Sequence, residues 1–371
     1  SGTRLLAGES KTFTITTEFD INATEIPNEP VKELTITLNY IQDDGQSITP
    51  SDPVISAPTL VNAILEDNEE KNDSNIDFSK TSEQDGTKGL YYTSTNTQGN
   101  QPTYYFRGAV ENNYVSFAGY YWRVIRINED SSVRMIYQGT TATATGASAT
   151  IGTSAFNEEY SDNTYLGYMY SFPQSSDYDS THANAFDSTI KIMLDDWYRK
   201  SLFTYASYLE DAGFCGDRSL AAGPGYGAEY SDYETHSRIM YLSEPQFSCP
   251  QSNDLYTYHS SYSNGNGMLS YPIGLISADE AMYAGGTTSN NNSSPDNTSY
   301  YLSIGISYWT MSPFIFSSSA YVGNIIADGA LGASEVNNAM LGVRPVINLK
   351  SSVEISGGDG TSSNPYVVIT N

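Results

Sequence analysis

Residues 307–313 read Ser-Tyr-Trp-Thr-Met-Ser-Pro, and residues 342–349 read Gly-Val-Arg-Pro-Val-Ile-Asn-Leu. Between these two segments the chain alternates small and apolar residues and carries the aromatic, serine and asparagine side chains that binding loops favour. The stretch predicts a recognition surface on a rigid scaffold, framed by the Trp-containing and the Arg-containing segments. The candidate ligand-binding residues, between 300 and 341, are Tyr300, Tyr301, Phe314, Phe316, Ser318, Tyr321, Asn324, Asn337 and Asn338.

The aromatic residues of this stretch allow two interpretations. Phe314, Phe316 and Tyr321 lie among few charges and show no helical period, so the pattern fits burial as well as display. Arg344 stands among apolar residues and is expected to be a half-buried strand residue paired with a carboxylate. The tryptophans occur in strand or helix patterns and are expected in the core: Trp122, Trp197 and Trp309.

The composition excludes one large class of partner. The 371 residues contain 17 Lys and Arg against 43 Asp and Glu, which gives a net charge of −26. Because phosphate binding needs clustered cations, we expect no nucleic-acid partner. The charge is spread among Ser, Thr, Asn and 31 Tyr, as in a solvated exterior outside a cell. With no apolar run of about 18 residues, membrane contact is expected only through an anchor absent from this chain.

The two cysteines, Cys215 and Cys249, lie in one irregular region. Neither belongs to a CxxC or a metal-finger spacing. In an oxidising compartment they would form a disulfide that closes this region, and the alternative is a pair of unrelated thiols. A bridge requires Cα atoms about 4.4–6.8 Å apart.

The chain is predicted to be α+β and to have three parts. Residues 1–50 alternate apolar and polar side chains, as at Phe13 and Ile15, and predict a small, β-sandwich-like all-β module. Residues 51–88 predict a short helix followed by an acidic linker. Residues 89–371 are expected to form the larger domain.

Local patterns predict several elements of the larger domain. Residues 120–127 and 133–137 are aromatic and β-branched and predict a hairpin. One helix is expected from Ser188, and a second from Ser277, where Glu280 completes a capping box. Residues 214–270 lack periodicity. A segment of that length is either functional or held in place by specific contacts, and a bond between the two cysteines could hold this one. Two strands end the chain.

Catalytic and metal signals are weak. The histidines show no HExxH spacing, the glycine-rich segment 223–227 lacks the lysine of a phosphate loop, and no GxSxG elbow occurs. The adjacent carboxylates of Asp195 and Asp196 fall on a predicted helix surface, although carboxylate pairs can also assemble from distant loops. Calcium is a possible cofactor, without an EF-hand spacing; the oxygen ligands available include Asp177, Asp179, Asp187, Asp254 and Asp296.

Five segments, in order, resemble a family of surface proteins of Gram-positive bacteria, whose domain is similar to the formylglycine-generating-enzyme branch of the C-type lectin-like fold. They are residues 104–108, 117–127, 271–280, 308–313 and 342–349. The resemblance spans 89–371 and implies a compact domain with a ligand-binding face between 300 and 341. Variable proteins of diversity-generating retroelements use the same fold and mutate this region. The paired catalytic cysteines of the enzyme branch have no counterpart after Cys249, which argues against that enzymatic activity.

These observations predict a non-enzymatic, extracellular, cell-surface-anchored protein for ligand binding or adhesion. Its expected partner is a protein or a glycan on another cell or surface. One alternative is a structural pilus or surface-layer subunit in which residues 1–50 polymerise or act as a spacer. The other is an enzyme of unknown type, which would need a pocket that holds two titratable groups in hydrogen-bond reach.

Overall fold

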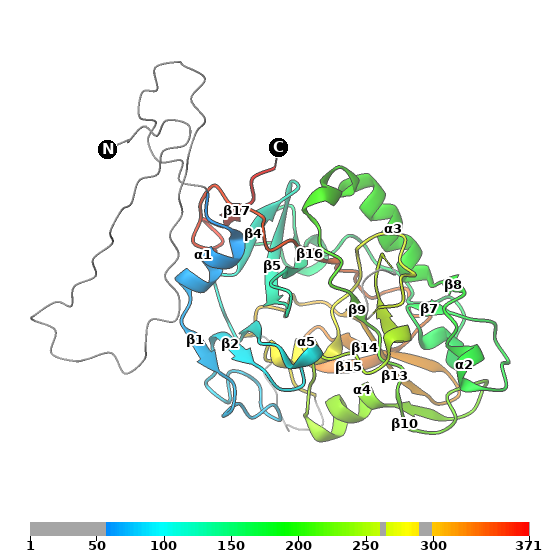
Figure 1. Ribbon diagram of the computed structural model, residues 1–371. Helices are drawn as coiled ribbons and strands as arrows, with labels where there is room; N and C mark the ends of the chain where they lie inside the picture. The colour runs from blue at the N-terminus through cyan, green and yellow to red at the C-terminus, as the bar shows by residue number, and fades with distance from the viewer. Residues whose placement is uncertain (1–56, 260–264, 289–298, 371) are drawn as a thin grey trace, which may run out of the picture. The chain divides into compact units, whose positions relative to one another are not determined.

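The computed structural model describes residues 57–259, 265–288 and 299–370 (Figure 1). The chain divides into two units, Ser1–Ser56 and Ala57–Asn371. The predicted β module at 1–50 lies outside the described residues. Within the described residues, none of the helices is both long enough and apolar enough to span a membrane.

The chain from 57 to 88, predicted as helix and linker, belongs to the larger unit. Helix α1 (Leu60–Asp67) begins at Thr59, whose side chain accepts a hydrogen bond from the Asn62 amide. Its apolar face is fully buried in the core, and strand β1 (Glu70–Asn72) then pairs with β2 (Gly89–Thr93) in parallel. The helix is held because burial of Leu60 and Ile64 removes apolar surface from water.

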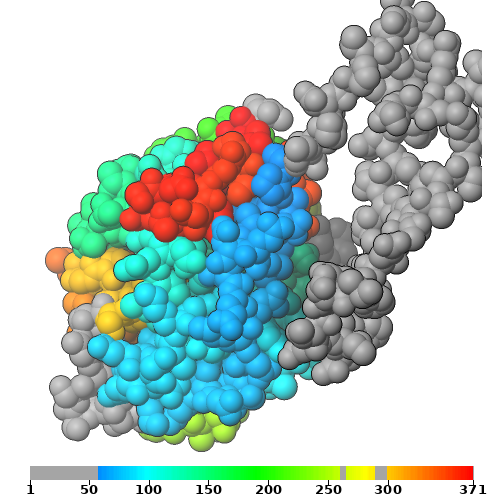
Figure 2. Space-filling view, turned by 90° about the vertical axis from the view of Figure 1, so that its left-hand side faces the viewer, coloured from blue at the N-terminus to red at the C-terminus, as the bar shows by residue number. Residues whose placement is uncertain are grey.

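The C-terminal segment covers α1. Thr59 forms an isolated bridge with Glu354, and the Tyr366 hydroxyl donates to the Asp67 carboxylate at 2.9 Å. Figure 2 shows these two ends of the unit, blue and red, side by side on one face. Residues far apart in sequence thus close the domain.

The larger sheet has the order β1-β2-β3-β5-β4-β17, and β6 pairs with both β5 and β16. The predicted hairpin is confirmed as β5 and β6, which pair antiparallel. The further strands of this sheet are β3 (Thr103–Arg107), β4 (Tyr114–Phe117), β5 (Tyr120–Ile127), β6 (Val133–Gly139), β16 (Val346–Leu349) and β17 (Tyr366–Val367).

The second sheet has the order β10-β11-β13-β14-β15. Three of its strands, β13 to β15, come from the predicted recognition surface between residues 300 and 341. Trp309 and Phe314 are fully buried in this sheet. Gly323 permits this packing, because a Cβ there would lie 2.6 Å from the Phe314 ring. The strands are β10 (Leu220–Ala222), β11 (Ser231–Tyr233), β13 (Tyr308–Phe316), β14 (Ala320–Ile325) and β15 (Leu331–Glu335).

Both predicted helices of the larger domain are present. Helix α3 (Thr189–Ser201) begins after Ser188, whose side chain caps the Lys191 amide. Helix α5 (Ala278–Tyr283) has the reciprocal capping box of Ser277 and Glu280. The shorter helices are α2 (Tyr178–Thr181), α4 (Glu234–Ser237) and the π-helical turn Arg238–Leu242.

Short elements complete the described structure. Strands β7 (Met169–Tyr170) and β8 (Phe186–Asp187) pair with each other, as do β9 (Phe214–Cys215) and β12 (Leu255–Tyr256). The 3-10 turns are Gln98–Asn100, Gly146–Ala149, Asn163–Leu166, Phe203–Tyr208 and Ser252–Asp254. The mixture of helices and sheets confirms the α+β class.

Arg344 differs from its prediction. Its side chain is fully buried, and its described partners are neutral: Nε donates to the Tyr137 carbonyl at 3.0 Å, and Nη1 to the Tyr308 hydroxyl at 3.1 Å. Nη2 donates to Gln138 Oε1 at 3.2 Å. The expected carboxylate is replaced by oxygens that the fold brings together, so Arg344 joins β6 to β13. Trp122 is fully buried like Trp309, and Trp197 is half-buried.

Candidate functional site

Five of the nine predicted contact residues lie in the core. The prediction that these five face a ligand is wrong, because the low charge of the stretch reflects burial; they are Tyr300, Tyr301, Phe314, Phe316 and Asn324. The Tyr300 hydroxyl donates to the Gly329 carbonyl and the Asn324 amide to Ser334 Oγ, both at 2.8 Å. Ser318 and Asn337 are exposed, and Tyr321 and Asn338 are half-buried.

Tyr321 belongs to a row of side chains across the second sheet. The backbone register places Asp232 opposite Ile315, Ile315 opposite Tyr321 and Tyr321 opposite Glu335. Directly opposed residues of antiparallel strands point to the same face, and all four are half-buried. The Tyr321 hydroxyl donates to Glu335 Oε1 at 3.0 Å. This row joins Ile315, Tyr321 and Glu335 of the predicted 300–341 region to Asp232 of β11.

Two further tyrosines flank the row at its β11 end. Tyr230 and Tyr241 are 53% and 64% exposed. Desolvation first, and then the nearby Asp232 carboxylate and Tyr241 phenol, raise the pKa of Tyr230. His236 connects them to the sheet: its Nδ1 lies 2.6 Å from Asp232 Oδ1, and its ring contacts Tyr241 and the buried Phe314. We call the set Tyr230, Asp232, Tyr241, Ile315, Tyr321 and Glu335 the tyrosine face.

Tyr230 and Tyr241 were not among the predicted contact residues. Strand β11 has three residues, too few to show a period of two, and its pairing with β13 joins positions far apart in sequence.

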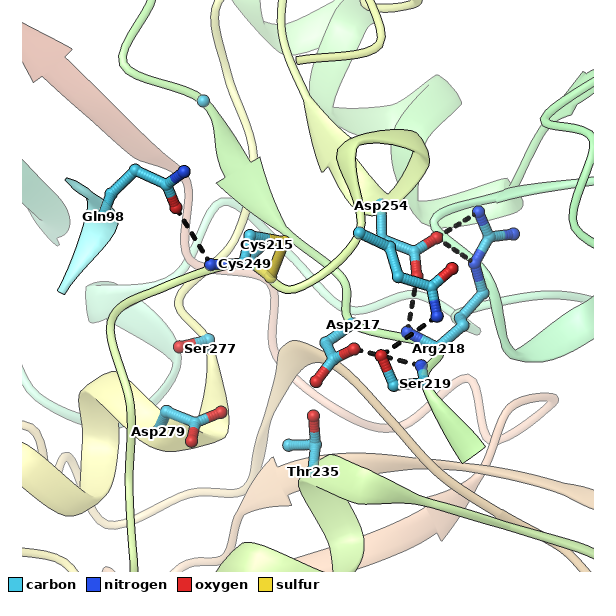
Figure 3. The surroundings of a disulfide bond; sticks show 12 residues. Gln98, Cys215, Asp217, Arg218, Ser219, Thr235, Cys249, Asp254, Ser277 and Asp279 are labelled. Carbon is cyan, nitrogen blue, oxygen red and sulfur yellow. Dashed lines mark hydrogen bonds and ion pairs between the residues drawn. A yellow bond between two sulfur atoms is a disulfide. The ribbon is translucent and has the colours of Figure 1, made fainter. Parts of the chain in front are cut away.

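The predicted disulfide is confirmed. Cys215 and Cys249 are joined with a Cα–Cα distance of 5.6 Å, and Figure 3 shows the bond among charged neighbours. The Cys249 amide donates to Gln98 Oε1 at 3.2 Å, so the bond also connects the irregular region to the first sheet. The disulfide is therefore a covalent constraint on residues 214–270.

A buried ion pair between Arg218 and Asp254 also constrains residues 214–270. The Arg218 guanidinium approaches Asp254 Oδ1 at 2.6 Å, and the Arg218 amide donates to Oδ2 at 2.7 Å. The side chains are 0% and 1% exposed. Arg218 Nη2 also donates to Asn184 Oδ1 at 2.9 Å. The long segment without periodicity is therefore held by specific polar contacts.

A second group of buried charges surrounds a cavity of about 20 Å³ beside Cys215, large enough for one water molecule. Glu280 lies 3.0 Å from Arg126 and 2.6 Å from Arg134. Arg238 lies 3.0 Å from Asp217 and 3.3 Å from Asp279. Because each of these carboxylates is paired with a guanidinium, the arrangement supplies structural ion pairs and not an available general base.

Two larger hollows lie on either side of Asp211. One, of about 340 Å³, is bounded by the disulfide, Asn128, Glu129 and Phe247. The other, of about 290 Å³, is bounded by four aromatic residues: Tyr198 in α3, Phe203 just after it, Tyr258 and Tyr271. Both reach the lower end of the volumes typical of small-molecule sites.

Among the described residues, the candidate calcium ligands are not gathered in one place. Asp177 caps α2 through the Ser180 amide, Asp187 pairs with Lys191 at 3.1 Å and Asp254 pairs with Arg218. Asp296 lies outside the described residues. Across 57–259, 265–288 and 299–370, no group of three His, Cys, Asp or Glu side chains is placed to hold a metal ion. Asp195 and Asp196 lie on helix α3 as predicted, where Asp195 pairs with Lys191 at 2.8 Å and Asp196 with Arg199 at 2.7 Å.

His182 predicts an acid-sensitive fold. Its burial, followed by the charge of Arg218, lowers its pKa to about 3. Between about pH 6.5 and 3 the unfolded chain takes up a proton that the folded chain excludes, so stability is lost as the pH falls. We expect His182 to cost about 2 kcal/mol of the free energy of unfolding at about pH 5 relative to about pH 7.5.

Urea unfolding at the two pH values tests this expectation. His182→Asn keeps a donor for the Tyr178 carbonyl, which His182 Nδ1 contacts at 2.8 Å, and should remove that part of the pH dependence. His259→Asn, at an exposed position, is the matched control. Equal pH dependence in wild type and His182→Asn would contradict the assignment.

No protein family, curated protein or solved structure matches this chain. The fold family inferred from the sequence motifs therefore stays a prediction. What the chain can do has to be inferred from its own surfaces.

Proposed function

We propose that this protein is a non-enzymatic binding protein of an extracellular surface, and that it contacts its ligand through the tyrosine face. The observation that carries the proposal is the row Asp232, Ile315, Tyr321 and Glu335 on a paired sheet, flanked by two exposed tyrosines. The C-type lectin-like fold, surface anchoring and diversification by a retroelement are further parts of the proposal. They are supported only by the sequence resemblance.

The chemistry of this face suits adhesion. Tyrosine supplies a large, amphipathic contact area with few rotatable bonds, so little conformational entropy is lost on binding. Strands β11, β13, β14 and β15 keep the side chains in fixed relative positions. Asp232 and Glu335 add acceptors for hydroxyl or cationic groups of a protein or glycan ligand. The disulfide is consistent with an oxidising, extracellular location.

The test replaces the tyrosines of this face together: Tyr230→Ser, Tyr241→Ser and Tyr321→Ser. Wild type and variant are applied to an array that carries neutral and acidic oligosaccharides and purified extracellular-matrix proteins. For each probe that the wild type binds, we expect the affinity of the triple variant to fall about thirtyfold or more, as for hot-spot residues worth 2 kcal/mol. Affinities are measured by biolayer interferometry.

Two controls separate binding from folding. Phe172→Ser removes an aromatic side chain that is 66% exposed at another position and should leave affinity unchanged. Phe314→Ala should lower the free energy of unfolding by about 3–5 kcal/mol, because this ring is fully buried. Unaltered binding by the triple tyrosine variant would refute the assignment of the site.

A further inference from the structure

The hollow of about 290 Å³ has aromatic walls. Tyr198, Phe203, Tyr258 and Tyr271 all line it. The rings of Tyr198 and Tyr271 are stacked, with centroids 4.8 Å apart and an interplanar angle of 20°. Tyr258 is 40% exposed and Phe203 is 61% exposed. An entering molecule therefore meets two accessible aromatic rings and a stacked pair, of which Tyr198 is buried and Tyr271 half-buried.

The phenols of this hollow lie close to one another. Burial first, and then the neighbouring Tyr258 and Tyr271 phenols, raise the pKa of Tyr198 to about 12. Tyr198 is consequently neutral at physiological pH. The aromatic rings of the hollow have the electron-rich faces that attract cations, with strength about 0.5–2 kcal/mol for each favourable ring.

The charge at the wall has the sign that favours a cation. The Asp211 carboxylate accepts hydrogen bonds from the amides of Tyr258 at 2.7 Å and His259 at 2.8 Å. These donors are neutral, so they hold the carboxylate in place and leave its charge. Lys350, also in the wall, donates from Nζ to the Ser207 carbonyl at 2.7 Å. The net charge of −26 adds a field that attracts cations from solution.

We propose that this hollow is a binding site for a methylated ammonium group, of the quaternary kind found in choline-type headgroups and trimethylated amines. Such a group carries charge without hydrogen-bond donors, and it is recognised by ring faces and a nearby carboxylate. The aromatic walls and Asp211 supply both. The site is separate from the tyrosine face and does not depend on the function proposed for it.

A strongly hydrated cation would be recognised differently. A primary ammonium needs several acceptors to replace its water, whereas a quaternary group can use the four Tyr and Phe rings that line this hollow. A neutral ligand of the same shape would gain ring contacts but nothing from the carboxylate. The charge on the ligand is therefore the property that separates this proposal from a general apolar hollow.

Isothermal titration of the full chain with choline chloride and with tetramethylammonium chloride tests the site. The neutral isostere 3,3-dimethylbutanol is titrated in parallel. We expect saturable binding of both cations and at least about tenfold weaker binding of the alcohol. Equal affinity for choline and the alcohol, or no saturable binding of either cation, would overturn the proposal.

Substitutions in the wall of the hollow test whether choline binds there. Tyr258→Leu and Phe203→Leu should each weaken choline binding about threefold to thirtyfold, and Tyr258→Phe should keep it within about threefold, because the ring remains. Phe172→Leu is the control at a different exposed aromatic residue. The triple tyrosine-face variant should bind choline like wild type, which makes the two sites independently testable. Full choline affinity in both Leu variants would also overturn the proposal.

Discussion

Asp254→Ala is expected to lower the free energy of unfolding by about 3–5 kcal/mol, because it leaves the Arg218 guanidinium charged, buried and without its counter-ion. Arg218 is fully buried, and its remaining partners are neutral oxygens, of which Asn184 Oδ1 at 2.9 Å is the nearest. The Arg218 amide also loses its acceptor. Guanidinium chloride unfolding followed by tryptophan fluorescence measures the effect.

The matched control is Asp196→Ala on α3. Asp196 pairs with Arg199 and Lys200 at the surface, where its side chain is 41% exposed. Exposed pairs contribute about 0–1 kcal/mol, so this variant should differ little from wild type. A double variant, Arg218→Met with Asp254→Leu, should recover much of the loss because no buried charge remains unpaired. A loss below about 1 kcal/mol in Asp254→Ala would contradict the role given to the pair.

Removal of the disulfide by Cys215→Ser with Cys249→Ser is expected to cost about 3–4 kcal/mol. The two cysteines are 34 residues apart in sequence, and a cross-link over that length restricts the unfolded chain by about this amount. The loss should appear as a lower denaturation midpoint. Within the folded state we expect the greatest increase of amide hydrogen exchange in residues 215–249, the loop that the disulfide closes.

A reductant gives the control for this experiment. Dithiothreitol should destabilise the wild type by the same amount and leave the double Ser variant unchanged. Both cysteines are half-buried and line the hollow of about 340 Å³, so the reagent has access in the folded state. Equal stability of wild type and variant without reductant would show that the ion pairs alone pin this region.

Local patterns in the sequence were sufficient to predict several elements of the structure. The Ser277 and Glu280 pattern predicted α5 and its capping box, and Ser188 predicted the start of α3. These depend on contacts within one turn, which the order of residues determines. The hairpin of β5 and β6 is also local, since its strands are joined by a short turn. The disulfide followed from two cysteines in one aperiodic region.

Other features needed contacts between distant residues. α1 was predicted as a helix, but its place in the core depends on Val353, which accepts a hydrogen bond from the Leu60 amide. Arg344 was correctly treated as structural, yet its partners come from β6 and from residues before β13. No local pattern distinguishes such neutral partners from a carboxylate.

The candidate site shows the same division. The residue types between 300 and 341 indicated either burial or display, and a single sequence does not separate the two because aromatic residues serve both. The sheet register decided it: Phe314 and Phe316 pack inward, while Tyr321 stays accessible between Glu335 of β15 and Ile315 of β13, which in turn lies opposite Asp232. Tyr230 and Tyr241 could be assigned to the tyrosine face only once the pairing of β11 with β13 was known.

By itself, the sequence determined the α+β class, the strongly acidic surface, two capped helices and the cysteine pair, because composition and short-range periodicity carry that information. The tertiary structure alone decided which aromatic side chains are core and which are surface, and which charges are paired. The 307–316 segment illustrates the reason. Its apolar character was visible in the chain, but the direction in which each side chain points depends on bulges in β13 and on its neighbours β11 and β14.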